Sequence, residues 1–124
     1  MQDFRKLVVW QRAQALAARV HRLTTSPKGG AHGAWRNQLQ RSVQSIAANV
    51  AEGAVRSTPR QFGHFLTIAL GSTSETESHL DFAWRIGALS SDDVMPLLDE
   101  AAQIRRMLTA LRKRVLETQR KTEH

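Results

Sequence analysis

Side chains able to carry nucleophilic, acid–base or metal chemistry are few in this sequence. Cysteine is absent, which excludes thiol catalysis and thiolate metal sites. The histidines show no His-Glu-x-x-His pattern and no other zinc spacing; they are His21, His32, His64, His79 and His124. His79 follows Glu75 by four residues, a spacing typical of a surface contact between neighbouring helix side chains. Serine catalysis through Ser42 or Ser45 would need a histidine that only the tertiary fold could bring close.

The glycine-rich segment KGGAHG (residues 28–33) does not resemble a phosphate-binding loop. No strand pattern precedes it and no Gly-Lys-Ser/Thr ending follows it. We therefore predict no catalytic residues, no metal site and no cofactor, and we expect the chain not to be an enzyme.

The net charge and its distribution along the sequence give the clearest indication of function. The 124 residues have a formal net charge of +7, which favours polyanions and acidic protein surfaces as partners. Residues 61–104 are acidic, with seven carboxylates against Arg85. Residues 105–124 are basic, with seven Arg or Lys against Glu117 and Glu123. Residues 4–51 contain no acid and eight basic residues, which are Arg5, Lys6, Arg12, Arg19, Arg22, Lys28, Arg36 and Arg41.

Two interpretations of this charge pattern compete. Arg12, Arg19 and Arg22 recur at spacings that place them on one helix face, and Arg36 and Arg41 extend the positive charge into the next helix. In the first interpretation these five residues bind RNA or DNA through its phosphate backbone. In the alternative, basic and acidic segments face each other within the fold or across a subunit interface, and the protein is an interaction scaffold that binds no nucleic acid.

Glycine, proline and serine divide the chain into four helical segments, roughly 9–25, 34–56, 59–87 and 91–118. Leu39, Val43, Ile46 and Val50 show the apolar spacing of one helix face, and the other segments repeat it. No segment alternates with period two for long enough to form a strand. The sequence predicts an all-α fold, an antiparallel up-down-up-down four-helix bundle in a single domain over residues 1–118, with a disordered tail at 119–124.

A polar stripe interrupts the apolar pattern of the second helix. Ser42, Ser45, Asn49 and Glu52 step by three, four and three residues, and Ala47, Ala48 and Ala51 flank them. Gly63 and Gly71 in the third helix indicate close backbone packing, because glycine inside a helix is costly. We interpret the stripe chiefly as contacts that orient the second and third helices within one subunit. A subunit interface and a ligand pocket are the alternatives.

No segment of the sequence predicts membrane insertion. The apolar stretch near the start covers only Leu7 to Trp10, and no run approaches the roughly 18 apolar residues that a membrane span needs. We expect a cytoplasmic protein without a membrane partner.

Three blocks in the sequence carry a family resemblance: DFRKLVVWQRA (3–13), SVQSIAANVAEG (42–53) and FGHFLTIALGSTSETESHL (62–80). Their order and spacing are similar to those of the four-helix bundle family encoded by intervening sequences in bacterial 23S ribosomal RNA genes. Ala47 departs from that pattern, because members often carry proline there. The residues that fall on the family motif and that we expect at an interface include Trp10, Ser45, Asn49, Glu52, Gly53, Gly71 and Glu75.

This resemblance implies a bundle of four antiparallel helices that assembles into a ring-shaped homopentamer, so a first expected partner is the chain itself. A related branch, the accessory proteins of diversity-generating retroelements, forms basic pentameric barrels that bind nucleic acid and a reverse transcriptase. That branch offers only an analogy for this chain. The family brings no established enzymatic activity with it.

Overall fold

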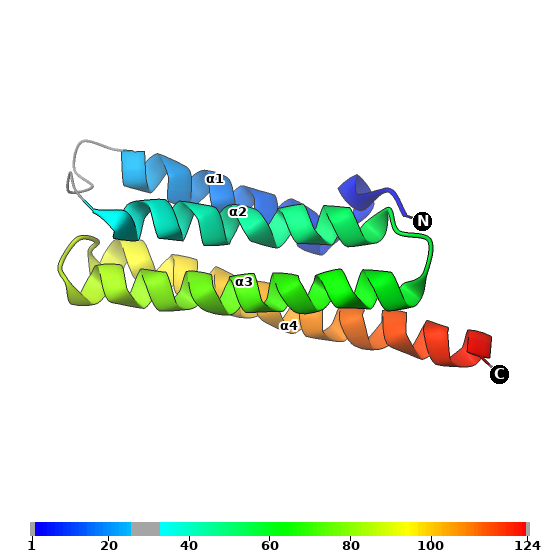
Figure 1. Cartoon of the computed structure of the whole chain (residues 1–124). Helices are drawn as coiled ribbons and strands as arrows, with labels where there is room; N and C mark the ends of the chain where they lie inside the picture. Colours follow the sequence, from blue (N-terminus) through cyan, green and yellow to red (C-terminus); the bar gives the residue numbers. More distant parts are fainter. Residues whose placement is uncertain (1, 26–32, 124) are drawn as a thin grey trace.

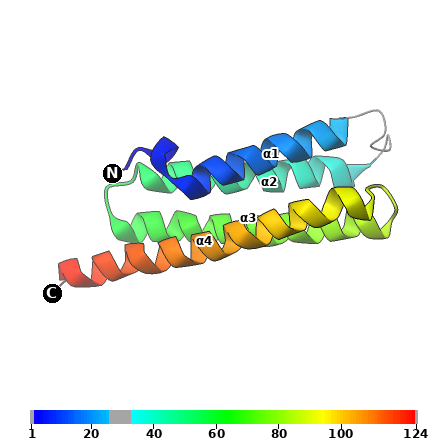
Figure 2. The ribbon, with the colours of Figure 1, turned by 180° about the vertical axis from the view of Figure 1, so that it is seen from behind.

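The computed structural model describes residues 2–25 and 33–123. A short 3-10 helix η1 (Phe4–Lys6) precedes four helices, α1 (Val8–Thr25), α2 (Ala34–Ala54), α3 (Pro59–Arg85) and α4 (Ser91–Glu123). Successive helices run in opposite directions along one bundle (Figure 1, Figure 2). The described residues contain no strand. The predicted all-α four-helix bundle is confirmed.

One core runs through the bundle, and the predicted apolar seams form it. The second-helix seam is fully buried, and so are large side chains from the other three helices, among them Leu16, Leu66, Leu80, Ile104 and Leu108. α3 packs along most of its length against α2 and α4, whereas α1 packs mainly against α2. α2 continues unbroken through Ala47, which lies in the core at 2% exposure.

The helix starts follow the local sequence signals. Thr58 precedes α3, its Oγ1 accepts the Gln61 N–H at 3.2 Å, and Pro59 takes the first helical position. Ser90 caps α4 in the same way, because its Oγ accepts the Asp93 N–H at 3.2 Å. Asp92 and Asp93 lie in the first turn of α4, where carboxylates interact favourably with the helix dipole.

The ends of α2 and α3 come earlier than predicted. α2 ends at Ala54, two residues before the predicted boundary at 56. α3 ends at Arg85 because Gly87 adopts a φ of +76°, a conformation that glycine tolerates best. The Gly87 N–H then donates to the Trp84 carbonyl at 3.0 Å and the Ala88 N–H to the Ala83 carbonyl at 2.9 Å, a pairing that closes a helix C-terminus.

α4 is longer than predicted, and the prediction of a disordered tail is wrong for residues 119–123. The helix continues to Glu123 because its last turns still contact α3. Leu116 fills the space above Gly63, and Gln119 Oε1 accepts the backbone N–H of Arg60 at 3.3 Å. His124, like residues 26–32 of the predicted first loop, lies outside the described residues.

None of the described helices is both long enough and apolar enough to cross a bilayer.

Candidate functional site

Arg12, the first of the five arginines predicted to bind nucleic acid, is already engaged within the chain. Its Nε and Nη2 donate to the two carboxylate oxygens of Glu100 on α4, at 2.9 and 2.5 Å. Nη2 also donates to Gln103 Oε1 at 2.6 Å, and Nη1 lies 3.4 Å from the sulfur of Met107. This bidentate pair joins α1 to α4. Arg12 therefore serves the fold, and its predicted role in nucleic-acid binding would require it to leave Glu100.

The same contact perturbs the carboxyl group of Glu100. The hydrogen bonds from Arg12 hold the pKa of Glu100 below its ordinary value of 4.5, against the opposing effect of burial. Because the folded pKa lies below the ordinary one, the pair stabilises the fold at neutral pH. That stabilisation is lost as the pH falls through the ordinary value toward the lowered pKa.

We expect Arg12→Ala to lower the free energy of unfolding by about 1–2 kcal/mol at pH 7, because Glu100 is left half-buried without its donors. Between about pH 5 and pH 3 the variant should lose less stability than the wild type, since its Glu100 pKa is no longer depressed. Urea unfolding followed by circular dichroism measures both effects. A variant that keeps the pH dependence of the wild type would contradict the role assigned to this pair.

The other four arginines do not gather on one surface. Arg19 and Arg22 are exposed on α1, and Arg22 lines a cavity of about 700 Å³ between α1 and α2. Arg41 is exposed on α2 and lines a different cavity, between α2 and α3. Arg36 is half-buried, with its guanidinium carbon 6.0 Å from the centre of the Trp35 ring. The predicted basic stripe is thus divided between two sides of α2.

The cavity between α2 and α3 brings together three of the sequence-predicted residues, Arg41, Ser45 and Glu75. Its volume is about 390 Å³, and its lining consists of polar side chains, which are Gln38, Arg41, Ser42, Ser45, Ser72, Glu75 and His79. We name it the polar groove. Arg41 and Glu75 are both exposed in it, and neither forms an ion pair within the described residues.

Hydroxyl groups on the floor of the polar groove connect its two helices. The Oγ atoms of Ser45 and Ser72 are 2.7 Å apart, and Thr76 Oγ1 donates to Ser42 Oγ at 3.1 Å. Asn49 Nδ2 donates to the carbonyl and the Oγ of Ser45, at 2.8 and 2.9 Å. The bonds of Ser45 to Ser72 and of Thr76 to Ser42 support the interpretation of the polar stripe as contacts that orient α2 against α3, whereas the bonds of Asn49 stay within α2. They also satisfy the serine hydroxyls inside the protein.

The chemistry that this groove offers is recognition through polar groups. Among the described residues no hydrogen bond joins His79 to a serine, so no nucleophile–base pair is assembled there. In the same part of the chain, no three His, Asp or Glu side chains gather in a group that could hold a metal ion.

The remaining motif residues lie elsewhere. Trp10 packs edge-on against Phe4, with ring centres 5.1 Å apart, beside the cavity between α1 and α2. Glu52 forms an ion pair with Arg56 one turn later. At Gly53 the backbone of α2 packs closely against α3, because a Cβ there would lie 2.8 Å from the Phe65 Cβ. These three residues serve contacts within the chain.

The two glycines of α3 differ in their surroundings. A Cβ at Gly63 would lie 2.7 Å from Leu116, so the predicted close packing is confirmed there. A Cβ at Gly71 would meet nothing within 4 Å, and Gly71 is exposed. The prediction of close packing at Gly71 is therefore wrong within one chain.

A group of cations on the second half of α4 was missing from the predicted site. Arg106, Lys113, Arg114, Arg120 and Lys121 are all exposed, and none forms an ion pair within the described residues. Lys6 joins them, because Lys6 and Arg114 line one cavity of about 410 Å³ between the start of α1 and α4. We name these six residues the basic end. The excess of basic residues after 105 was the signal for them, but it was partly assigned to a disordered tail.

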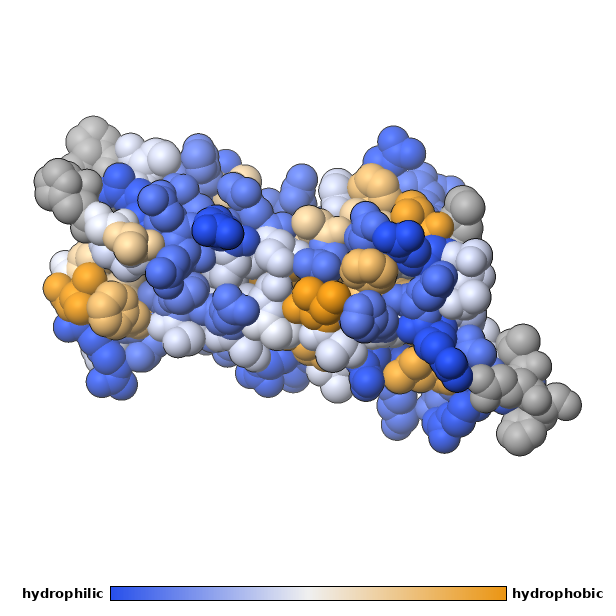
Figure 3. Space-filling model, in the orientation of Figure 1, coloured by the Kyte–Doolittle hydropathy of each residue, from blue (hydrophilic) through white to orange (hydrophobic). Residues whose placement is uncertain are grey.

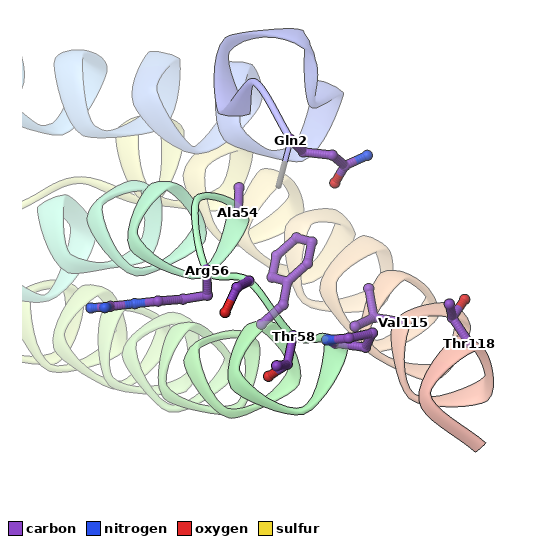
Figure 4. A pocket seen from close by; sticks show the side chains of 9 residues that line it. Gln2, Ala54, Arg56, Thr58, Val115 and Thr118 are labelled. Carbon is purple, nitrogen blue, oxygen red and sulfur yellow. The ribbon is translucent and has the colours of Figure 1, made fainter. Parts of the chain in front are cut away.

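A cavity lined partly by uncharged polar side chains lies next to the basic end in the sequence of α4. It has a volume of about 270 Å³ and opens between the turn that joins α2 to α3 and the last part of α4, lined by Gln2, Thr58, Val115 and Thr118 among others (Figure 4). Arg56 lines it too, but its side chain extends away from Val115 and Thr118 (Figure 4). Among the described residues, no carboxylate lines this cavity or the one between Lys6 and Arg114.

Comparisons with known proteins agree with this architecture. The chain resembles, at 24% sequence identity, a solved structure of a protein of unknown function from the S23 ribosomal protein family of Bacteroides thetaiotaomicron VPI-5482. The two align with a TM-score of 0.78 over 86% of this chain and 99% of the other, which is a likeness of fold. A comparison with curated proteins gives no match. Residues 5–110 match the family described as 23S rRNA-intervening sequence protein, and the chain therefore belongs to that family.

Proposed function

We propose that this protein is a non-enzymatic, homo-oligomeric nucleic-acid-binding protein whose basic end contacts the phosphate backbone of RNA or DNA. The single observation that carries the proposal is the set of exposed cations of the basic end, which form no ion pair with any residue that the structure describes. A cation without a carboxylate partner is free to displace counterions from phosphates, and that displacement supplies most of the affinity of sequence-independent binding.

The dimensions of α4 suit this role. Residues 106–121 of a helix span about 22 Å. Duplex DNA carries about a dozen phosphate charges over that length, so several of them can be reached at once. The arginine side chains can also bind phosphate through two parallel hydrogen bonds. Because these groups contact phosphates and not base edges, we expect binding with little sequence preference.

The basic end is favoured over the α1–α2 arginines for a structural reason. Arg12 is held by Glu100, and Arg22 and Arg41 lie on different sides of α2. The cations of α4 share one helix and are joined by Lys6 across a cavity without carboxylates.

A homo-oligomer, the pentameric ring that the family resemblance implies, would multiply this weak contact. Several copies present several basic ends to one strand, so the second and later contacts form at a high effective concentration. The scaffold alternative also predicts an oligomer, but there the charges serve assembly and no nucleic acid binds.

The test is a titration of a fluorescently labelled RNA of about 20 nucleotides, followed by anisotropy at increasing potassium chloride. We expect binding at low salt, and we expect the logarithm of the affinity to fall linearly with the logarithm of the salt concentration. A duplex DNA of the same length should behave similarly. No change in anisotropy at the lowest salt would contradict the proposed function.

A further inference from the structure

α3 presents an unusual outer face to solvent. Ile68, Gly71, Glu75, Ser78 and Phe82 follow one another at spacings of three and four residues, so they lie on one face of the helix, and all five are exposed. We name this face the α3 seam. Ile68 is 39% and Phe82 is 51% exposed. The space-filling view shows hydrophobic atoms over the middle of α3 and at its end beside α4, on a surface that is otherwise mostly hydrophilic (Figure 3).

Position 71 lies in the middle of this seam, and no contact within the chain explains why it is a glycine. Glycine inside a helix costs about 1 kcal/mol relative to alanine. At Gly53 and Gly63 a neighbour within 3 Å of the missing Cβ explains that cost, whereas at Gly71 nothing lies within 4 Å. The seam therefore leaves room for a second helix to approach the α3 backbone closely from outside the chain.

α1 carries a matching face. Val8, Gln11, Ala15, Ala18 and Arg22 repeat the same spacing of three and four residues, and all are exposed, Val8 to 57%. We name this face the α1 seam. Its middle consists of small alanines, which permit close approach. Its one charged residue, Arg22, has no ion-pair partner within the described residues, and the same holds for Glu75, the one charged residue of the α3 seam.

The two seams lie at the same height along the bundle. Gln40 Nε2 donates to Thr24 Oγ1 at 2.8 Å, which aligns the end of α1 with the first half of α2. Thr76 Oγ1 donates to Ser42 Oγ at 3.1 Å, which aligns the same part of α2 with α3. Arg22 precedes Thr24 by two residues, and Glu75 precedes Thr76 by one. Since α1 and α3 run in the same direction (Figure 1), two copies in the same orientation can place Arg22 of one opposite Glu75 of the other.

From these observations we propose that the α3 seam is the docking site for the α1 seam of a second copy of this chain, with Ala18 close to Gly71 and Arg22 paired with Glu75. This inference rests on the homo-oligomeric part of the proposed function. The two seams lie on either side of α2, because each lines a cavity with residues of that helix. A contact between two different faces of the same chain is head-to-tail, and it closes into a ring when the rotation between copies permits.

Gly71→Leu is the variant that separates this docking from folding. The position is open within one chain, so the helix content of the variant should match that of the wild type, and its melting temperature should be no lower when both are measured at concentrations where the chain is monomeric. In the assembly the leucine would occupy the space of the α1 helix. Size-exclusion chromatography with light scattering should then show a shift from the oligomer to the single-chain mass of 13.9 kDa. Thr109→Leu, at an exposed position of α4 outside both seams, is the matched control and should keep the oligomeric mass.

Exchange of the two charges tests the pairing itself. Arg22→Glu and Glu75→Arg should each weaken assembly by about 10-fold or more, and the double variant should restore it, because the two opposite charges then meet again. If the Gly71→Leu variant keeps the oligomeric mass, and the double variant Arg22→Glu with Glu75→Arg assembles no better than the single variants, the proposed docking is overturned. The proposed homo-oligomer would still stand. A wild-type protein with the single-chain mass at all concentrations would overturn both. An Arg22→Glu variant that keeps the oligomeric mass but no longer binds RNA would also overturn the docking, since the α1 seam would then bind nucleic acid.

Discussion

Lys113→Glu combined with Arg114→Glu is expected to weaken RNA binding by about 30- to 100-fold at moderate salt. Both residues are exposed on α4 and form no ion pair in the described part of the chain. Their replacement therefore removes two cations that neutralise phosphates and adds two repulsive charges at the same place. The slope of affinity against salt should also become shallower, by about one unit for each phosphate that the variant no longer neutralises. Anisotropy titrations at three or four salt concentrations measure both quantities.

The matched control is Arg19→Glu combined with Arg41→Glu, which changes the net charge by the same amount. Both of these arginines are exposed, and both belong to the stripe that the sequence indicated. If the basic end is the contact surface, this control should weaken binding by no more than about 5-fold, through the total charge alone. Equal losses of affinity in the two double variants would contradict the assignment, because binding would then follow net charge and not position.

Gly53→Val is expected to have the largest effect on folding, a loss of about 3 kcal/mol in the free energy of unfolding. Any Cβ at this position would lie 2.8 Å from the Phe65 Cβ and 3.2 Å from the backbone carbonyl oxygen of Phe62. Neither atom can move without moving the α3 backbone, so α2 and α3 must separate. Chemical unfolding followed by circular dichroism measures the loss.

Gly71→Val is the control for this prediction, because the same side chain there meets nothing within 4 Å. Its free energy of unfolding, measured at protein concentrations where the chain is monomeric, should stay within about 0.5 kcal/mol of the wild type. A similar loss of stability at both positions would contradict the explanation by contact with α3, because valine has a higher helix propensity than glycine and nothing at Gly71 obstructs its side chain.

The sequence alone was enough to predict the fold because its signals are local. The 3.6-residue spacing of apolar residues marks each buried face, and Thr58 with Pro59 and Ser90 with Asp92 mark two helix starts. The end of α4 was missed because apolar periodicity weakens after Val115. The contacts that hold the helix beyond that point, from Leu116 to Gly63 and from Gln119 to Arg60, join residues far apart in the chain.

The candidate site was predicted less completely, for the same physical reason. The sequence shows that Arg12 is basic, but not that Glu100, 88 residues later, takes up its guanidinium. The sequence places a glycine at position 71 inside a predicted helix, but it does not show whether that glycine faces another helix of the chain or solvent. Pairing between distant charges decides which cations stay available to a partner, and that pairing is a property of the tertiary structure.

The most direct test of the proposed function is light scattering coupled to size-exclusion chromatography, at low and high salt, with and without a short RNA. We expect a homo-oligomer, near five times 13.9 kDa, that elutes with RNA at low salt and releases it at high salt without a change in its own mass. An oligomer that never elutes with RNA, even at the lowest salt, would contradict the proposed function and favour a scaffold whose charges serve assembly.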